Sequence, residues 1–140
     1  MKPSDIYRST AWKYFSRYIL LIYSDGLITQ CSTCGKMLQI NNANCHVGHL
    51  IKVTDSYATA FDENNVLPQC LACNRYHGGR QDVMYKKLVE IHGQKAIDML
   101  YIRKNNICHL DRFTLDILAK EYKGKFDALV KIKGNPWKKY

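Results

Sequence analysis

Two Cys-x-x-Cys pairs place the strongest constraint on how this chain can fold. The pairs are Cys31 with Cys34 and Cys70 with Cys73. Four thiolates presented by two tight turns match a tetrahedral zinc site in which protein ligands fill every position. Such a site is structural, and the segment between the two pairs carries His49 and Asn65. The sequence therefore predicts a two-knuckle zinc site that holds other functional residues in place.

The cellular compartment decides whether cysteines bind metal or form disulfides. The chain starts Met1-Lys2-Pro3-Ser4 without an apolar signal segment, and no stretch is long enough to span a membrane. We therefore expect no membrane association and a reducing, cytoplasmic location, where paired Cys-x-x-Cys indicates metal binding. Of the two other cysteines, Cys108 is expected to be a buried apolar residue. Cys45, which is close in sequence to His46 and His49, could serve as a reserve ligand.

The chain is strongly basic, with a formal net charge of +9. This balance favours a polyanionic partner, because Lys and Arg side chains that neutralise phosphates release condensed counterions. Residues 120–140 contain seven lysines and two acids, with Trp137 and Tyr140 among them. A solvated tail is the alternative interpretation. The candidate DNA contacts in this stretch are Lys131, Lys133, Lys138 and Lys139.

The apolar pattern predicts a single α+β domain over residues 1–140. Residues 1–26 are expected to form an N-terminal helix, residues 27–92 a zinc-stabilised core, and residues 93–140 a helical basic region. Ser4 or Asp5 could cap the first helix. Its apolar positions recur at helical spacing and are Trp12, Phe15, Ile19 and Ile22.

Shorter elements are predicted inside the core and after it. Residues 27–30 read as a strand, residues 41–44 as a hairpin or an irregular turn, and residues 54–69 mostly as a loop. Helices are expected before Gly93, over residues 96–102, and from Asp111 onward.

Three polar positions follow an order that is typical of HNH endonucleases: a histidine, an asparagine shortly before a Cys-x-x-Cys pair, and a His or Asn after it. In this chain His49, Asn65 and either Asn74 or His77 fall at those places. Together with the two knuckles, this register resembles the HNH family. The resemblance implies a small ββα-metal element, also called the His-Me finger, flanked by helices.

The residue types also suit phosphodiester hydrolysis, which needs a base to activate water and a cation to stabilise charge. An imidazole that titrates near neutral pH suits the base, which makes His49 the candidate. Asn74 can offer an amide oxygen to Mg²⁺ or Mn²⁺, and His77 would share its helix face as a second ligand. Asn74 could equally cap the helix. Asn65 is better placed to hold a loop by backbone hydrogen bonds.

Within this group the chain most resembles the phage NinG recombination proteins, also called Rap. The similarity covers roughly residues 31–93, about half of the chain. It implies a structure-selective endonuclease that cuts D-loops and four-way (Holliday) junctions during phage recombination in a bacterial host. A homodimer would suit the two-fold symmetry of such a junction. The matching segments are Cys31-Ser32-Thr33-Cys34-Gly35-Lys36, Gly48-His49, Phe61-Asp62-Glu63-Asn64-Asn65-Val66, Pro68-Gln69-Cys70 and Cys73-Asn74-Arg75.

One position departs from the wider HNH pattern. Many HNH enzymes carry a metal-binding aspartate just before the catalytic histidine, whereas this chain has Gly48, as the NinG group does. A cation held mainly by Asn74 needs another ligand. Gly48 also leaves open a second function, a non-catalytic zinc module that binds nucleic acid. The candidates for the missing ligand, in order of preference, are Asp62, His77, His46 and Asp55, although Asp62 could instead cap its own loop.

Overall fold

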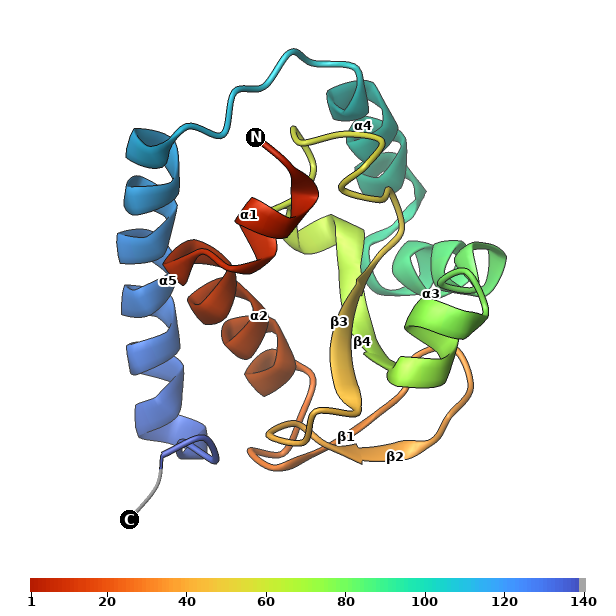
Figure 1. The fold of residues 1–140 in the computed structure, drawn as a ribbon. Helices are drawn as coiled ribbons and strands as arrows, with labels where there is room; N and C mark the ends of the chain where they lie inside the picture. The colour runs from red at the N-terminus through yellow and green to blue at the C-terminus, as the bar shows by residue number, and fades with distance from the viewer. Residues whose placement is uncertain (139–140) are drawn as a thin grey trace.

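Helices flank a small β layer in the computed structural model, which describes residues 1–138 (Figure 1). The helices are α1 (Pro3–Tyr7), α2 (Thr10–Ile22), α3 (Gln81–His92), α4 (Gln94–Lys104) and α5 (Arg112–Lys133). The strands are β1 (Ile28–Gln30), β2 (Met37–Gln39), β3 (Cys45–His49) and β4 (Val66–Cys70). A 3₁₀ turn spans Glu63–Asn65 and a π-helical turn spans Ala72–Tyr76. The predicted α+β class is confirmed.

The strands form two separate antiparallel pairs, β1 with β2 and β3 with β4. In the second pair Cys45 lies opposite Cys70 and His49 lies opposite Val66. Because β2 and β3 pair with different partners, residues 41–44 form an irregular turn rather than a hairpin. The β3–β4 pair lies between α2 on one side and α3 on the other (Figure 1).

The loop predicted over residues 54–69 is wrong at its C-terminal end, where β4 is a fully buried strand. Proline has no N–H for a ladder and is normally excluded from the interior of a sheet. In a two-stranded sheet, however, each strand has one unpaired edge, so Pro68 costs no ladder hydrogen bond there. Its carbonyl accepts a hydrogen bond from the Ser32 N–H (3.0 Å), which links β4 to the first knuckle.

The N-terminal segment forms two helices rather than the single helix predicted. Ser9 adopts an extended conformation and its hydroxyl accepts a hydrogen bond from the Trp12 N–H (3.1 Å), which caps α2. This cap ends one helix and starts the next. The expected apolar face is present at Phe15 and Ile19, which are buried, whereas Ile22 is 37% exposed.

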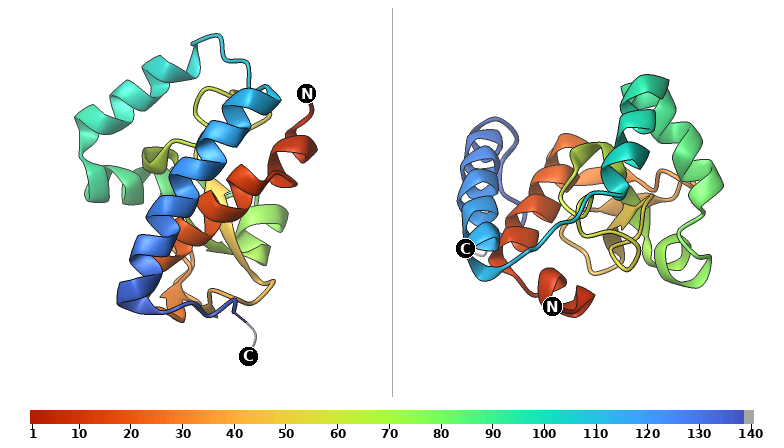
Figure 2. Two further views of the ribbon diagram at one scale, coloured as in Figure 1. Left: turned by 90° about the vertical axis from the view of Figure 1, so that its left-hand side faces the viewer. Right: turned by 90° about the horizontal axis from the view of Figure 1, so that it is seen from above.

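Helix α5 packs along α2, so the two ends of the chain share one core (Figure 2). Tyr122 meets Phe15 edge to face at a ring-centroid distance of 4.8 Å. At the far end, Lys133 Nζ donates to the carbonyls of Leu21 (2.7 Å), Ile22 (3.1 Å) and Ser24 (2.8 Å). Lys133 therefore caps the C-terminus of α2. No helix in residues 1–138 is long and apolar enough to cross a membrane.

Helices α3 and α4 pack on the other side of the hairpin in a second apolar cluster that includes Leu50 and Leu67. As predicted, α3 ends at Gly93, whose φ of 89° suits glycine. The helix expected over residues 96–102 is α4, and Asp111 caps α5 by accepting a hydrogen bond from the Thr114 N–H (2.8 Å). These helices support the strand that carries the second knuckle.

Candidate functional site

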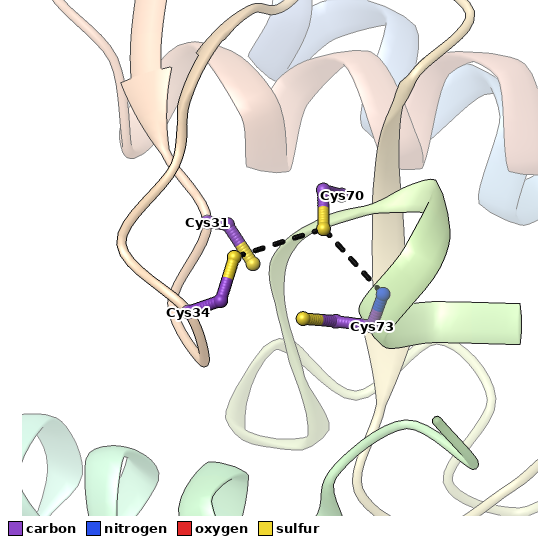
Figure 3. Close-up of side chains that lie close together, drawn as sticks. All are labelled: Cys31, Cys34, Cys70 and Cys73. Atoms are coloured by element: carbon purple, nitrogen blue, oxygen red, sulfur yellow. Dashed lines mark hydrogen bonds between the residues drawn. The ribbon is translucent and has the colours of Figure 1, made fainter. Parts of the chain in front are cut away.

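Four cysteine side chains meet between the first knuckle and the end of β4 (Figure 3). The sulfurs of Cys31, Cys34, Cys70 and Cys73 all lie within 4.8 Å of one another, and the Cys34 and Cys70 sulfurs are 3.8 Å apart. Tetrahedral zinc with Zn–S bonds of about 2.3 Å separates its sulfurs by about 3.8 Å. The cluster therefore has the donor atoms and the spacing to hold a metal ion such as zinc.

Hydrogen bonds join the two knuckles to each other and to the hairpin. Gln69 in β4 is fully buried, and its Nε2 donates to Thr33 Oγ1 (3.1 Å) in the first knuckle and to the Gly79 carbonyl (2.8 Å). The first knuckle closes through the Gly35 N–H, which donates to the Cys31 carbonyl (2.9 Å). The metal site and the β3–β4 hairpin therefore form one structural unit.

Neighbouring groups act in opposite directions on the thiols of this cluster. A backbone hydrogen bond at Lys36 lowers the pKa of Cys34, but burial and the neighbouring sulfurs outweigh it and raise that pKa to about 12. Arg80 Nε donates to the Cys73 sulfur (3.2 Å), which places a cation beside it. Burial raises the pKa of the Cys31 thiol, but hydrogen bonds from Thr33 and from backbone N–H groups outweigh burial and bring that pKa to about 6. Cys45 differs from Cys31, because burial and the nearby sulfurs raise its pKa to about 11. The structure does not place Cys45 among the clustered ligands.

A pocket of about 580 Å³ lies against β3 and the π-helical turn that follows β4. His49 lines it from the end of β3, and Asn74 lines it from the helical turn together with His46. Lys52 and Arg75 add two exposed cations to its wall. The structure thus brings the predicted base and a predicted metal ligand into one hollow that attracts anions.

His49 is held rigidly at the pocket wall. Its ring is 8% exposed and stacks on Trp12 with centroids 5.2 Å apart, and Tyr7 meets it edge to face. Its Nε2 lies 2.9 Å from the Ala60 carbonyl. Because a nitrogen that faces a carbonyl must carry the proton, Nδ1 keeps the lone pair. Burial lowers the pKa of His49 to about 4, so the ring is neutral at pH 7.

Asn65 holds the long connection between β3 and β4. Its Oδ1 accepts from the Ile51 N–H (2.7 Å), and its Nδ2 donates to the carbonyls of Ile51 (2.9 Å) and Thr59 (3.0 Å). These are the backbone hydrogen bonds expected of it from the sequence. Because Asn65 is fully buried, it acts by positioning the connection next to His49 rather than by contacting substrate.

Replacing Asn65 by alanine is expected to lower the free energy of unfolding by about 3 kcal/mol or more. The change leaves the buried N–H and carbonyl of Ile51 without a partner, each of which costs about 1–3 kcal/mol, whereas the Thr59 carbonyl keeps its hydrogen bond from the Asp62 N–H (3.2 Å). Urea unfolding of the zinc-loaded protein measures the difference. Asn64→Ala is the matched control, since the Asn64 side chain is partly exposed, and it should change stability by about 0.5 kcal/mol or less. Equal effects of the two changes would contradict the bracing role.

Gly48 has a packing reason that the sequence did not reveal. A Cβ atom at this position would lie 1.9 Å from Gln69 Oε1 and 2.7 Å from Gln69 Cδ. The space is therefore filled by the side chain that joins the knuckles. An aspartate at position 48 would require the Gln69 side chain to move, so the glycine is consistent with how this hairpin packs.

Two predicted metal ligands lie away from Asn74. Asp62 forms an ion pair with Arg103 (2.7 Å), accepts a hydrogen bond from the Asn64 N–H, and lines a second cavity instead. It therefore caps its own loop, the alternative considered from the sequence. His77 is exposed, ends the π-helical turn, and is not part of the pocket lining.

The four lysines proposed as DNA contacts have different surroundings. Lys133 is engaged at the end of α2, whereas Lys131 and Lys138 are exposed. Lys139 lies outside the described residues, as does Tyr140. DNA contact by these lysines stays a prediction.

One family profile, described as Bacteriophage Lambda NinG protein, matches residues 1–132. The chain belongs to the NinG family. The match is wider than the resemblance found over residues 31–93, because it also includes α1, α2, α4 and nearly all of α5. No curated protein and no solved structure matches this NinG-family chain.

Sequence reasoning missed several pocket residues of this NinG-family protein. Tyr7 was not assigned a role, and Trp12 was taken as part of a helix face, yet both contact His49. Lys52 was also missed, and nothing in its sequence context distinguishes it. Arg75 could have been found, because it directly follows Asn74 in the helical turn.

Proposed function

We propose that this NinG-family protein is a metal-dependent endonuclease that cuts branched DNA. The observation that carries the proposal is the pocket in which a neutral buried imidazole, an amide and two cations meet. The order strand, strand, helical turn around His49 and Asn74 supports the proposal, because the HNH register implies a ββα element at these residues. The four-cysteine cluster lies at the end of the β3–β4 pair where Cys45 is opposite Cys70, away from His49.

His49 would act as the general base. Its Nε2–H is held by the Ala60 carbonyl, so Nδ1 is the atom that accepts a proton from water. In the free protein the ring is fully neutral at pH 7, because its pKa is about 4. A phosphodiester anion bound in the pocket raises that pKa, since a nearby opposite charge favours the protonated ring. Substrate binding therefore makes His49 a stronger base.

The other pocket residues would bind and orient the phosphodiester. Lys52 and Arg75 supply positive charge, and a guanidinium can hold two phosphate oxygens at once. Asn74 lies next to the phosphate position and is a candidate metal ligand. A divalent cation such as Mg²⁺ or Mn²⁺, bound there, would stabilise the charge that develops on the phosphate and the leaving oxygen.

A basic and aromatic surface on α2 and α5 is the proposed DNA-binding surface outside the pocket. The Arg17 guanidinium lies 5.1 Å from the ring centroid of Trp137, and the ammonium groups of Lys13 and Lys123 lie 5.4 and 5.9 Å from that of Tyr14. Cations bind the backbone, and aromatic rings suit unpaired bases at a branch. The preference for branched DNA itself comes from the family resemblance. The proposal includes a homodimer on a four-way junction.

Cleavage of a labelled four-way junction beside a linear duplex of the same arm sequence tests the proposal. The zinc-loaded protein is assayed with added Mg²⁺, with added Mn²⁺, and with no added divalent ion. We expect metal-dependent cutting of the junction and little cutting of the duplex. Equal cutting of both substrates would remove the branch preference but keep the nuclease. Binding of the junction without cutting in either metal would instead identify a non-catalytic zinc module.

A further inference from the structure

The pocket beside His49 contains a second histidine whose environment matches that of a metal ligand. Among the described residues that line the pocket, none is an Asp or Glu. Position 48 is a glycine and supplies no ligand, and the Gln69 side chain occupies the space beside it. His46 lies two residues earlier in β3, and alternate residues of a strand point to the same face. His46 therefore offers its ring from the same face of β3 as position 48.

The hydrogen bonds of His46 leave one nitrogen ready to bind a cation. Its Nε2 lies 3.0 Å from the Ala43 carbonyl, so Nε2 carries the proton and Nδ1 keeps the lone pair. Metal-binding histidines typically donate their other ring N–H to a carbonyl in this way, which fixes the tautomer and the ring orientation. The ring is only partly buried, so water can complete a coordination shell.

Asn74 stands at the correct distance to be the neighbouring ligand. Its Nδ2 lies 3.1 Å from His46 Nδ1. Turning the Asn74 amide by about 180° about its last torsion, which has two-fold preference, exchanges Nδ2 for Oδ1. Adjacent ligands of an octahedral ion with bonds of about 2.1 Å are about 3.0 Å apart. A cation can therefore replace the hydrogen bond without movement of either backbone.

We propose that His46 Nδ1 and Asn74 Oδ1 together bind the divalent cation of this pocket, and that the pair selects Mn²⁺, Co²⁺ or Ni²⁺ over Mg²⁺. The role of this cation in cleavage rests on the proposed nuclease function. The arrangement of its two ligands does not depend on that function. Imidazole nitrogen binds Ni²⁺ and Co²⁺ more tightly than Mn²⁺, and it binds all three more tightly than Mg²⁺, which prefers carboxylates and water. Two neutral ligands without a carboxylate therefore favour the transition ion.

The surrounding charge determines how strongly the free protein binds this cation. Burial is the main cause that lowers the pKa of His46, and the positive charge of Arg75 lowers it further. The same positive charge repels a metal ion. A substrate phosphate offsets Arg75 and adds oxygen ligands, so the cation binds more weakly without DNA. Experiments on the protein without DNA should therefore use divalent metal ions at millimolar concentration.

Paramagnetic broadening by Mn²⁺ tests the site without any cleavage assay. Amide and histidine ring signals of the untagged, zinc-loaded protein are recorded by NMR as Mn²⁺ is raised to millimolar concentration. We expect selective broadening of residues 43–48 and 72–76. The His46→Ala variant should need at least about tenfold more Mn²⁺ for the same broadening. The His77→Ala variant, which removes a nearby exposed histidine, should behave like wild type.

Competition with Mg²⁺ tests the selectivity. Restoring the lost signals should take at least about a tenfold excess of Mg²⁺ over Mn²⁺ in wild type, and a smaller excess in a His46→Asp variant. Broadening that is centred on His77, that survives His46→Ala, or that stays absent at millimolar Mn²⁺ would overturn the site. A protein that binds Mn²⁺ as described but cuts no DNA would keep the metal site and refute the nuclease.

Discussion

The His49→Ala variant is expected to cut a four-way junction about 10²–10⁴ times more slowly than wild type, the usual contribution of a general base. In wild type the Ala60 carbonyl holds Nε2–H, and Trp12 stacks on the ring, so the Nδ1 lone pair has a fixed direction. Alanine removes this proton acceptor but leaves Lys52 and Arg75 in the pocket. Junction binding and zinc content should therefore stay at wild-type values. Single-turnover cleavage, gel shift and zinc analysis measure the three quantities.

A matched variant separates the chemistry of His49 from its packing. Glutamine can place an amide N–H where Nε2–H meets the Ala60 carbonyl, but it has no basic nitrogen. His49→Gln should therefore stay folded and be as slow as His49→Ala. A His49→Gln protein that cleaves at the wild-type rate would show that His49 is only a packing residue. Loss of zinc in either variant would mean that the ring supports the cysteine cluster instead.

The buried position of His49 also determines how activity depends on pH. Burial lowers its pKa to about 4, so its protonation removes almost no base between pH 7 and pH 5. A base with an ordinary pKa near 6.5 would lose about thirtyfold of kcat/KM at pH 5. The ratio of kcat/KM for wild type to kcat/KM for His49→Gln, measured from pH 7 to pH 5, isolates the contribution of the base from changes in metal or DNA binding. This ratio should stay almost constant over that range.

The lowered pKa of His49 also makes the folded protein less stable as the pH falls. Below pH 6.5 the unfolded chain protonates His49 while the folded chain does not, so unfolding takes up a proton. The stabilisation is complete above pH 6.5 and falls as the pH decreases toward 4, by about 3 kcal/mol in total. The His49→Gln variant should lack this contribution.

The parts of the site that depend on local chemistry could be predicted from the sequence. The four cysteines were found because a Cys-x-x-Cys turn brings two sulfurs together wherever it occurs. Asn65 was recognised as a brace for a similar reason, since asparagine often bonds to nearby backbone. The helix end at Gly93 and the helix start at Asp111 also follow from signals carried by single residues.

Other parts depend on contacts between distant segments, and these were missed. The buried strand β4 was missed, and it contains Pro68, which is tolerated because that strand has an unpaired edge. Asp62 was placed before His46 among the candidate ligands, but Arg103 of α4 forms an ion pair with Asp62. Only the pairing of β3 with β4 and the position of the following helical turn bring His46 to Asn74.

Gly48 shows how a missing side chain can have a packing role that the sequence alone does not reveal. Its lack of a side chain suggested a decayed metal site and hence a binding module. In the structure, Gly48 makes room for Gln69, which bonds to Thr33 of the first knuckle. The glycine therefore serves the cysteine cluster. The pocket and the cysteine cluster share strands β3 and β4, so their residues cannot be interpreted independently.

This sharing makes a change in the cysteine cluster the largest expected effect on the fold. Cys70 is buried at the end of β4, directly opposite Cys45 of β3. Binding of structural zinc contributes on the order of 10 kcal/mol in small domains, more than most domains have as net stability. The Cys70→Ser variant is expected to lose its zinc and to unfold over residues 27–80, with loss of dispersed amide signals and of junction cleavage.

Cys108→Ser is the matched control, because Cys108 is partly exposed and lies outside the cluster. It should keep one zinc per chain, the wild-type spectrum and full cleavage. Removing zinc from the wild-type protein with a chelator should reproduce the Cys70→Ser spectrum, and adding zinc back should restore only the wild type. A Cys70→Ser protein that stays folded and active without zinc would show that apolar packing alone holds the hairpin. The shared strands would then position His49 and Asn74 without help from the metal.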